Sequence, residues 1–200
     1  ARRMVGLRGG AEAVTEEHMM PLWVANTYVH VGVDSADSLM TVLLSYAATE
    51  GLLLRKEDQD SRLGPRLSLL IATDGVEQRR LRKLVARWTE LRGYAAHGQR
   101  PPVGAVAKFL EEDPSALPAG AFFGLDTVRQ AAAIRASNVL RRVFLAFLFS
   151  MFSLDEYGRP VPHLSRNEVL ELLEKAAQGD SHAAAHIVAE VPQAVREMAE

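Results

Sequence analysis

The sequence contains no cysteine among its 200 residues, which excludes disulfide bonds, thiolate zinc sites, iron–sulfur clusters and thiol nucleophiles. Long apolar runs are also missing, because the longest, Val143 to Phe152, is too short and too interrupted to span a bilayer. Residues 1 to 20 lack a charged start followed by an apolar stretch, so we expect no signal peptide. Together these absences predict a soluble, cytoplasmic protein with no membrane partner.

The composition is that of a chain with enough apolar residues for one ordinary core. Hydrophobic residues make up 48% of it, and 14 glycines and 9 prolines are too few for a disordered or collagen-like chain. The length allows one domain with a small appendage, and it needs no structural metal to fold. Because the chain begins with Ala1 rather than with methionine, a fragment of a longer protein is one interpretation.

The charge is unevenly distributed. The net charge of −2 argues against bulk attraction to nucleic acid. Residues 76–100, however, hold seven bases and two acids, a sum of +5, whereas residues 154–200 hold four bases and nine acids, a sum of −5. A basic stripe on an acidic chain is typical of a local phosphate-binding face, and the alternative is a solvated helix surface.

Helix-forming residues dominate and alternating strand patterns are nearly absent, so we predict an all-α fold, an antiparallel helical bundle with a C-terminal helical tail. The stretch Trp23 to Val33 looks strand-like, but we favour helix there because its neighbours are helical. Predicted helices run from a cap at Asp34 or Asp37 to Leu54, from Arg62 to Ala72, from Asp74 to His97, from Val103 to Glu112, and from a cap at Asp126 to Met151.

Turn residues divide the chain. Gly98 suits the end of the helix that starts at Asp74, where Glu77 would complete a capping box. The Gly- and Pro-containing stretch 155–163 is the best domain boundary, which separates a bundle (1–153) from a linker and short acidic tail (154–200). Ser165 and Glu168 predict a second capping box, and Gly179 separates the two tail helices.

Two charged residues fall within apolar helix stripes. On an ideal helix Arg92 lies about 20° from Leu81. It therefore falls inside the stripe of Leu81, Leu84, Val85, Trp88, Leu91 and Ala95. Glu50 lies near the centre of a face shared by Leu39, Leu43, Tyr46, Ala47 and Leu54. Since a buried unpaired charge costs several kcal/mol, we expect Glu50 and Arg92 to meet, either as an ion pair that fixes helix register or as a carboxylate that orients an arginine beside a cleft.

His97 follows Arg92 by five residues, which is about 140° around an ideal helix. A shared target for both side chains requires that the helix end distorts or that the substrate bridges them. Gly93 and the terminal position of His97 favour distortion. The alternative is a histidine that only interacts favourably with the helix dipole.

The segment Leu91-Arg92-Gly93-Tyr94-Ala95-Ala96-His97-Gly98 resembles the LRxxxxHG signature of HEPN domains, whose general motif is Arg, four to six residues, His. The surroundings resemble the ApeA-like branch, with a glutamate before a leucine run (residues 50–54), an Arg-Leu segment (62–72), the motif helix and a long final helix. The resemblance covers residues 34 to 153. It implies a four- to five-helix bundle, usually a homodimer, whose two motifs line one cleft.

Many HEPN domains are metal-independent endoribonucleases of toxin–antitoxin, abortive-infection and CRISPR defence systems, and others bind RNA or nucleotides without cutting. The resemblance implies that His97 is the general acid/base, that Arg92 stabilises the phosphoryl oxygens, and that Glu50 orients Arg92, with no cofactor or metal. RNA-binding candidates are Arg79, Arg82, Lys83 and Arg100, and the partners are RNA, a second copy and an antitoxin or partner domain. Active members often place Asn, Asp or His after the arginine, where this chain has Gly93.

The sequence also contains weaker candidate patterns. His182, His186 and Glu190 have a helical i, i+4, i+8 spacing that suits a divalent ion, although no HExxH motif is present. Phe144, Phe147, Phe149 and Phe152 are expected in the core or at a dimer interface rather than on a base-stacking surface. The rival hypotheses are a non-catalytic interaction module, in which the same residues only hold helices together, and a regulatory or sensor domain of a longer protein.

Overall fold

A computed structural model describes residues 38–111 and 122–198, together with Trp23 and Thr27; the side chains of residues 122–126 are not described. The fold is all-α, as the sequence predicted, and within the described ranges it also contains one short hairpin that the sequence did not predict. The first part consists of α2 (Ser38–Leu53), the 3₁₀ turn η1 (Asp60–Arg62), α3 (Leu63–Ile71), α4 (Gly75–Ala96), α5 (Val103–Leu110) and α6 (Phe122–Met151). The second part consists of β1 (Phe152–Leu154), β2 (Pro160–Pro162), α7 (Arg166–Ala177), α8 (Ser181–Glu190) and α9 (Gln193–Arg196).

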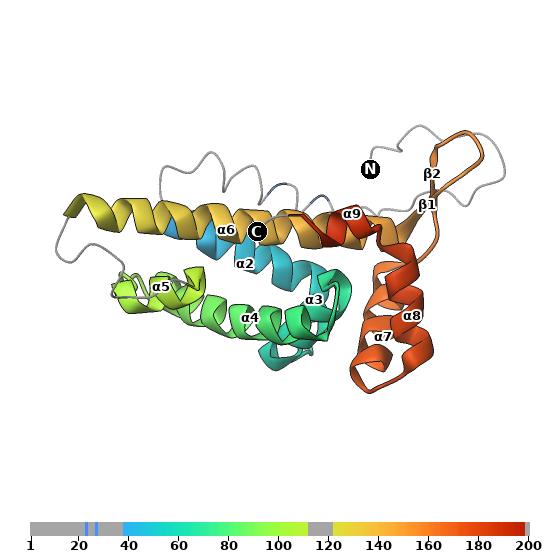
Figure 1. Ribbon diagram of the computed structural model, residues 1–200, viewed down its shortest axis with the longest axis horizontal. Coiled ribbons are helices and arrows are strands. Elements are labelled where there is room, and N and C mark those ends of the chain that lie inside the picture. Colours follow the sequence, from blue (N-terminus) through green and yellow to red (C-terminus); the bar gives the residue numbers. More distant parts are fainter. Residues whose placement is uncertain (1–22, 24–26, 28–37, 112–121, 199–200) are drawn as a thin grey trace.

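The long helix α6 runs the length of the molecule, and α2 lies along it (Figure 1). Helix α4 forms the opposite layer and packs against α2 and α3, with α5 bridging α4 and α6 at one end. At the other end the antiparallel hairpin β1–β2 projects outward, while α7 and α8 pack together and contact α3 and α6. The predicted boundary stretch thus forms the hairpin, and the helices beyond it lie on the bundle.

Helix α4 begins after the N-cap residue Asp74. The Asp74 carboxylate accepts hydrogen bonds from the backbone N–H groups of Val76 and Glu77, both at 2.8 Å. The predicted reciprocal bond is wrong, because the Glu77 carboxylate accepts from Thr73, at 2.6 Å from its backbone N, rather than from Asp74. The donor that Glu77 satisfies is thus one residue further from the helix than in a capping box, but it still lies ahead of the first turn.

The other end of α4 is a Schellman motif, as Gly98 predicted. Gly98 adopts a φ of +65°, and its N–H donates to the Ala95 carbonyl at 3.1 Å. The Gln99 N–H donates to the Tyr94 carbonyl at 2.9 Å. Left-handed φ at this position favours glycine, so the sequence itself ends the helix at His97.

The remaining helix limits agree with the sequence in most places. Ser165 and Glu168 form the predicted capping box, with the Ser165 N–H 2.7 Å from the Glu168 carboxylate. Gly179, at a φ of +97°, separates α7 from α8. The predicted cap at Asp126 is wrong, because α6 already begins at Phe122. Trp23 and Thr27 are helical, but the rest of 23–33 and both predicted caps of α2 lie outside the described residues.

The core is one continuous cluster that extends from the bundle into the tail. The α4 stripe is buried at Leu81, Leu84, Val85, Trp88 and Leu91, as predicted. The same cluster includes tail residues, among them Val169, Leu170, Leu173, Ile187 and Val191. The predicted face of α2 is only partly right: Tyr46 is fully buried, but Leu39 and Leu43 are only half-buried, and the buried positions also include Val42, Ser45, Thr49 and Leu52. Apolar residues surround α2 on all sides, so periodicity could not identify its core face.

Buried arginines fasten the tail to the bundle. Arg142 of α6 donates to the Ile71 carbonyl at 2.7 Å, to the Glu77 carboxylate at 2.8 Å and to the Arg196 carbonyl. Arg196 in turn donates to the Ala72 carbonyl at 2.6 Å. These bonds satisfy carbonyls at the end of α3 that no helical N–H reaches.

The phenylalanines of α6 contribute to the core unequally. Phe147 is fully buried, Phe144 and Phe152 pack partly buried against the core, and Phe149 is 36% exposed. Among the helices within the described ranges, none is both long enough and apolar enough to cross a membrane.

Candidate functional site

Arg92 of α4 faces two carboxylates and one aromatic ring. One guanidinium nitrogen lies 3.6 Å from Glu50 Oε1, and another lies 3.7 Å from Asp60 Oδ2. The guanidinium carbon is 5.3 Å from the centroid of the Tyr46 ring, within the range of a cation–π contact. The predicted meeting of Glu50 and Arg92 is therefore confirmed, and η1 supplies a second acid that the sequence did not indicate.

The pair lies at the rim of the α2–α4 interface rather than inside it. The Arg92 side chain is 36% exposed and the Glu50 side chain is 21% exposed. Full burial of Arg92 in the apolar stripe was therefore a wrong prediction. The long arginine side chain lies along the buried helix surface and carries its charged head to the solvent edge.

Burial and neighbouring charges act on the groups around Arg92. Burial raises the pKa of Glu50, Asp60 raises it further, and the attraction of Arg92 opposes both effects. Burial also raises the pKa of Tyr46, whose hydroxyl lies 2.9 Å from Thr89 Oγ1. Asp60 has a 57% exposed side chain, so one cation is shared between a half-buried and an exposed carboxylate. The site thus holds one arginine in a fixed place and is negatively charged when both acids are ionised.

His97 lies at the exposed C-terminal end of α4. Its backbone N–H donates to the Gly93 carbonyl at 3.2 Å, so the helix is regular up to this residue. Of the two routes to a shared target, distortion of the helix end is therefore absent, and on a regular helix residues 92 and 97 lie about 140° apart. Within the described part of the chain, the His97 side chain has no hydrogen bond or ion pair. A single copy therefore does not bring His97 and Arg92 together.

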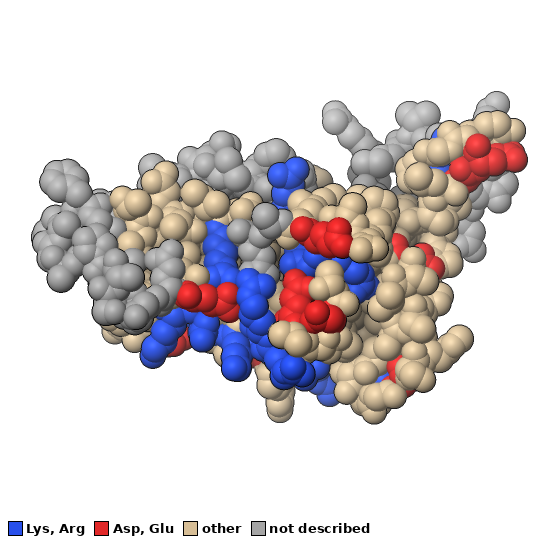
Figure 2. All heavy atoms as spheres, viewed as in Figure 1, with Lys and Arg blue, Asp and Glu red and all other residues tan. Residues whose placement is uncertain are grey.

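The four RNA-binding candidates Arg79, Arg82, Lys83 and Arg100 are all exposed. Figure 2 shows basic side chains gathered over α4, with acidic side chains among them. On the helical wheel the three candidates within α4 span about 100°, and His97 falls inside that sector. Part of the stripe is engaged elsewhere: Glu111 lies 2.9 Å from Arg80 and 3.7 Å from Arg87.

A hollow of about 870 Å³ lies at the opposite end of α4. Arg92 and His97 take no part in its lining. Acidic and basic side chains alternate there, and they are paired: Glu77 with Arg142, and Glu111 with Arg135, each pair at 2.8 Å. Although burial alone would raise the pKa of both glutamates, their hydrogen bonds with Thr73 and Arg142, and with Arg135 and Arg80, hold it below the usual value.

The histidines of the tail form a different cluster from the predicted one. His186 and Glu190 lie together on α8, but the third member is His163, which follows β2. His182 is exposed one turn earlier on α8 and does not belong to the cluster. Sequence spacing within one helix could not identify His163, because it precedes His186 by 23 residues and is brought to α8 by the fold of the chain after the hairpin.

The chain matches no protein-family model, no curated protein sequence and no solved structure. The resemblance to HEPN domains therefore rests on the motif residues and on the order of the helices, and it stays a prediction.

Proposed function

We propose that this chain acts on RNA as a HEPN-type, metal-independent endoribonuclease in stress or phage defence. The observation that carries the proposal is the exposed imidazole of His97 at the end of a basic helix, with no hydrogen bond or ion pair to any residue that the structure describes. Five residues before it stands an arginine whose position is fixed by Glu50, Asp60 and Tyr46. An imidazole and a guanidinium are the two groups that cleavage beside a 2′-hydroxyl needs.

In the proposed reaction the 2′-hydroxyl of RNA attacks the adjacent phosphorus. The new bond joins O2′ to phosphorus while the bond from phosphorus to O5′ breaks, which gives a 2′,3′-cyclic phosphate and a 5′-hydroxyl. The His97 imidazole accepts the 2′-hydroxyl proton as the general base and, once protonated, gives a proton to the departing O5′ as the general acid. The forked guanidinium of Arg92 stabilises the charge on the phosphoryl oxygens, and Glu50 holds it in position.

The reaction calls for two copies of the chain. Because His97 and Arg92 diverge in one copy, a two-fold dimer that places the His97 of each copy beside the Arg92 of the other would supply both groups at each site. The basic side chains Arg79, Arg82, Lys83 and Arg100 would then hold the RNA backbone on the shared face, with affinity that falls as salt rises.

The test uses purified protein and a mixed RNA substrate in excess EDTA. We expect cleavage with cyclic phosphate ends, and we expect His97→Ala to reduce the rate by at least about 10²-fold. His182→Ala is the matched control, because it removes an exposed histidine from another helix and should leave the rate unchanged. Equal rates for the wild type and His97→Ala would contradict the proposal.

The second candidate function is a non-catalytic RNA-binding or dimerisation module. The observation that favours it is the pairing of Arg92 with two carboxylates, which leaves little positive charge for a phosphate. If this candidate holds, no preparation cleaves RNA, and salt-dependent RNA binding is weakened by Arg82→Ala and Lys83→Ala but not by His97→Ala. Because Arg92 is one-third exposed, Arg92→Ala should cost only about 1 kcal/mol of stability.

A further inference from the structure

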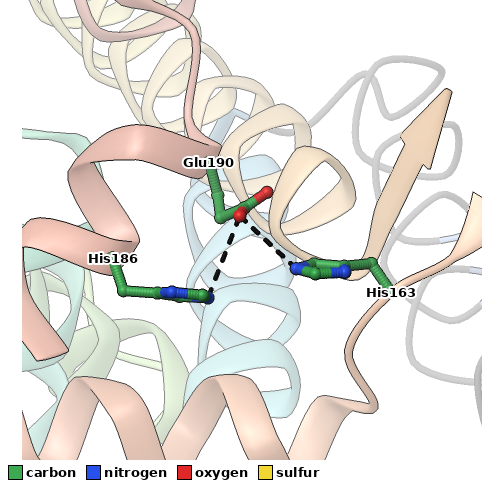
Figure 3. Close-up of side chains that lie close together, drawn as sticks. All are labelled: His163, His186 and Glu190. Carbon is green, nitrogen blue, oxygen red and sulfur yellow. Dashed lines mark ion pairs between the residues drawn. The ribbon is translucent and has the colours of Figure 1, made fainter.

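Three potential metal ligands converge where the hairpin meets α8. Figure 3 shows the His163 and His186 imidazoles on either side of the Glu190 carboxylate, with both ion pairs ending on the same oxygen. Glu190 Oε1 lies 3.4 Å from His163 Nε2 and 3.8 Å from His186 Nε2. All three ligand atoms lie within 4.8 Å of one another.

We propose that His163, His186 and Glu190 bind a zinc ion. Two imidazoles and one carboxylate form a donor set that zinc prefers. In a tetrahedral site with bonds of about 2.0–2.1 Å, neighbouring ligand atoms are about 3.4 Å apart. The two nitrogen–oxygen distances match that edge within a few tenths of an ångström. Side-chain rotations that bring the two nitrogens, now within 4.8 Å of each other, to the same separation would complete the site.

The scaffold holds the ligands from two directions. His186 and Glu190 are four residues apart and lie on one face of α8. The next residues, Ile187 and the C-cap Val191, are buried in the core and hold the helix in place. His163 is fixed through its backbone, because its N–H donates to the Met151 carbonyl at 2.8 Å. The nearly parallel imidazole rings, with an interplanar angle of 16° and centroids 6.2 Å apart, present their nitrogens to the same side as the carboxylate.

An independent observation comes from His186 Nε2. This nitrogen is buried and has no hydrogen-bond partner among the described residues, since Glu190 is too distant to accept or donate. A buried polar atom without a partner destabilises the folded chain. A zinc ion bound between the three side chains uses this lone pair and removes that destabilisation.

Solvent reaches the edge of the cluster, because the His163 side chain is 38% exposed. Three protein ligands with one open position leave room for a water molecule. The ion links the end of β2 to α8, so its binding energy also stabilises the packing of the tail. The zinc ion lies outside the proposed ribonuclease site and takes no part in that reaction.

The test titrates Zn²⁺ into EDTA-treated, dialysed protein and follows heat by calorimetry and the melting temperature by circular dichroism. We expect one ion per chain and a higher melting temperature. His163→Ala, His186→Ala and Glu190→Gln should each weaken binding by at least about tenfold. His182→Ala, on the same helix, should bind like the wild type. Mg²⁺ should not bind, because imidazole ligands do not suit a hard cation.

Glu190→Gln keeps the size of the side chain, so it tests the site even if a histidine variant folds poorly. The absence of stoichiometric Zn²⁺ binding to the folded wild type would overturn the proposal. Equal losses of affinity in His182→Ala and His186→Ala would also overturn it. The ribonuclease test is run in EDTA, which removes zinc, so its outcome does not depend on whether the chain binds zinc. Either proposal can therefore be contradicted while the other stands.

Discussion

At the residue scale, the Glu50–Arg92 contact is the part of the candidate site that sequence reasoning could find. Both residues fell on helix faces occupied by apolar side chains. A charge in such a place is destabilising without a partner of opposite sign, so the two residues were expected to pair. Asp60 could not be found in this way, because it comes from η1, whose position relative to α4 depends on tertiary packing. Tyr46 was expected on the same face of α2 as Glu50, but its contact with the guanidinium was not.

The raised pKa of Glu50 makes stability depend on pH in a defined direction. A carboxyl whose pKa is higher in the folded than in the unfolded protein binds its proton more tightly when folded, so its contribution to stability falls as pH rises. The fall begins near the ordinary value of 4.5 and ends above the raised pKa. We expect the free energy of unfolding of the wild type, relative to Glu50→Gln, to decrease over this window in urea titrations.

Asp58 provides a control of opposite sign. Burial would raise its pKa, but hydrogen bonds from Arg66 and from the Arg55 backbone outweigh burial and hold the pKa below the ordinary 3.8. The stability of the wild type relative to Asp58→Asn should therefore increase as pH rises toward 3.8. The same sign of slope for both variants would contradict the assignment of these shifts.

At the scale of elements, sequence predicted helix limits well wherever a cap residue determines them. The Schellman end at Gly98 and the capping box at Ser165 depend on a few neighbouring residues, which a sequence displays directly. The predicted start of α6 was wrong and the predicted core face of α2 was only partly right, because no local signal distinguishes among several apolar or helix-forming positions. His163 lies beside α8 because of how the chain folds after the hairpin, and local sequence patterns do not predict such tertiary contacts.

The two glycines of the motif segment should respond in opposite ways to alanine. A Cβ at Gly93 would meet no atom within 4 Å, and this residue lies inside α4. Gly93→Ala should therefore raise the free energy of unfolding by about 0.5–1 kcal/mol. Gly98→Ala should lower it by about 1–2 kcal/mol, because the residue has a left-handed φ of +65°. Urea denaturation measures both, and a destabilising Gly93→Ala would contradict the regular helix described here.

At the scale of the whole molecule, the tail and the bundle share one core, so they should unfold together. Leu170→Ala, in α7, should cost about 2–5 kcal/mol and should shift the unfolding reported by Trp88, which is fully buried in the bundle. Replacing the exposed Trp23 with phenylalanine leaves Trp88 as the single tryptophan signal. A Trp88 transition that is unaffected by Leu170→Ala would show that the tail is energetically separate.

The most direct test of the central claim mixes two inactive variants. If each catalytic site combines the His97 of one copy with the Arg92 of the other, a heterodimer of His97→Ala and Arg92→Ala has one intact site. We expect each variant alone to be inactive on RNA in EDTA, and an equal mixture, after subunit exchange, to recover about a quarter of the wild-type rate. No recovery in a mixture shown to contain heterodimers, or no cleavage by the wild type, would contradict the account.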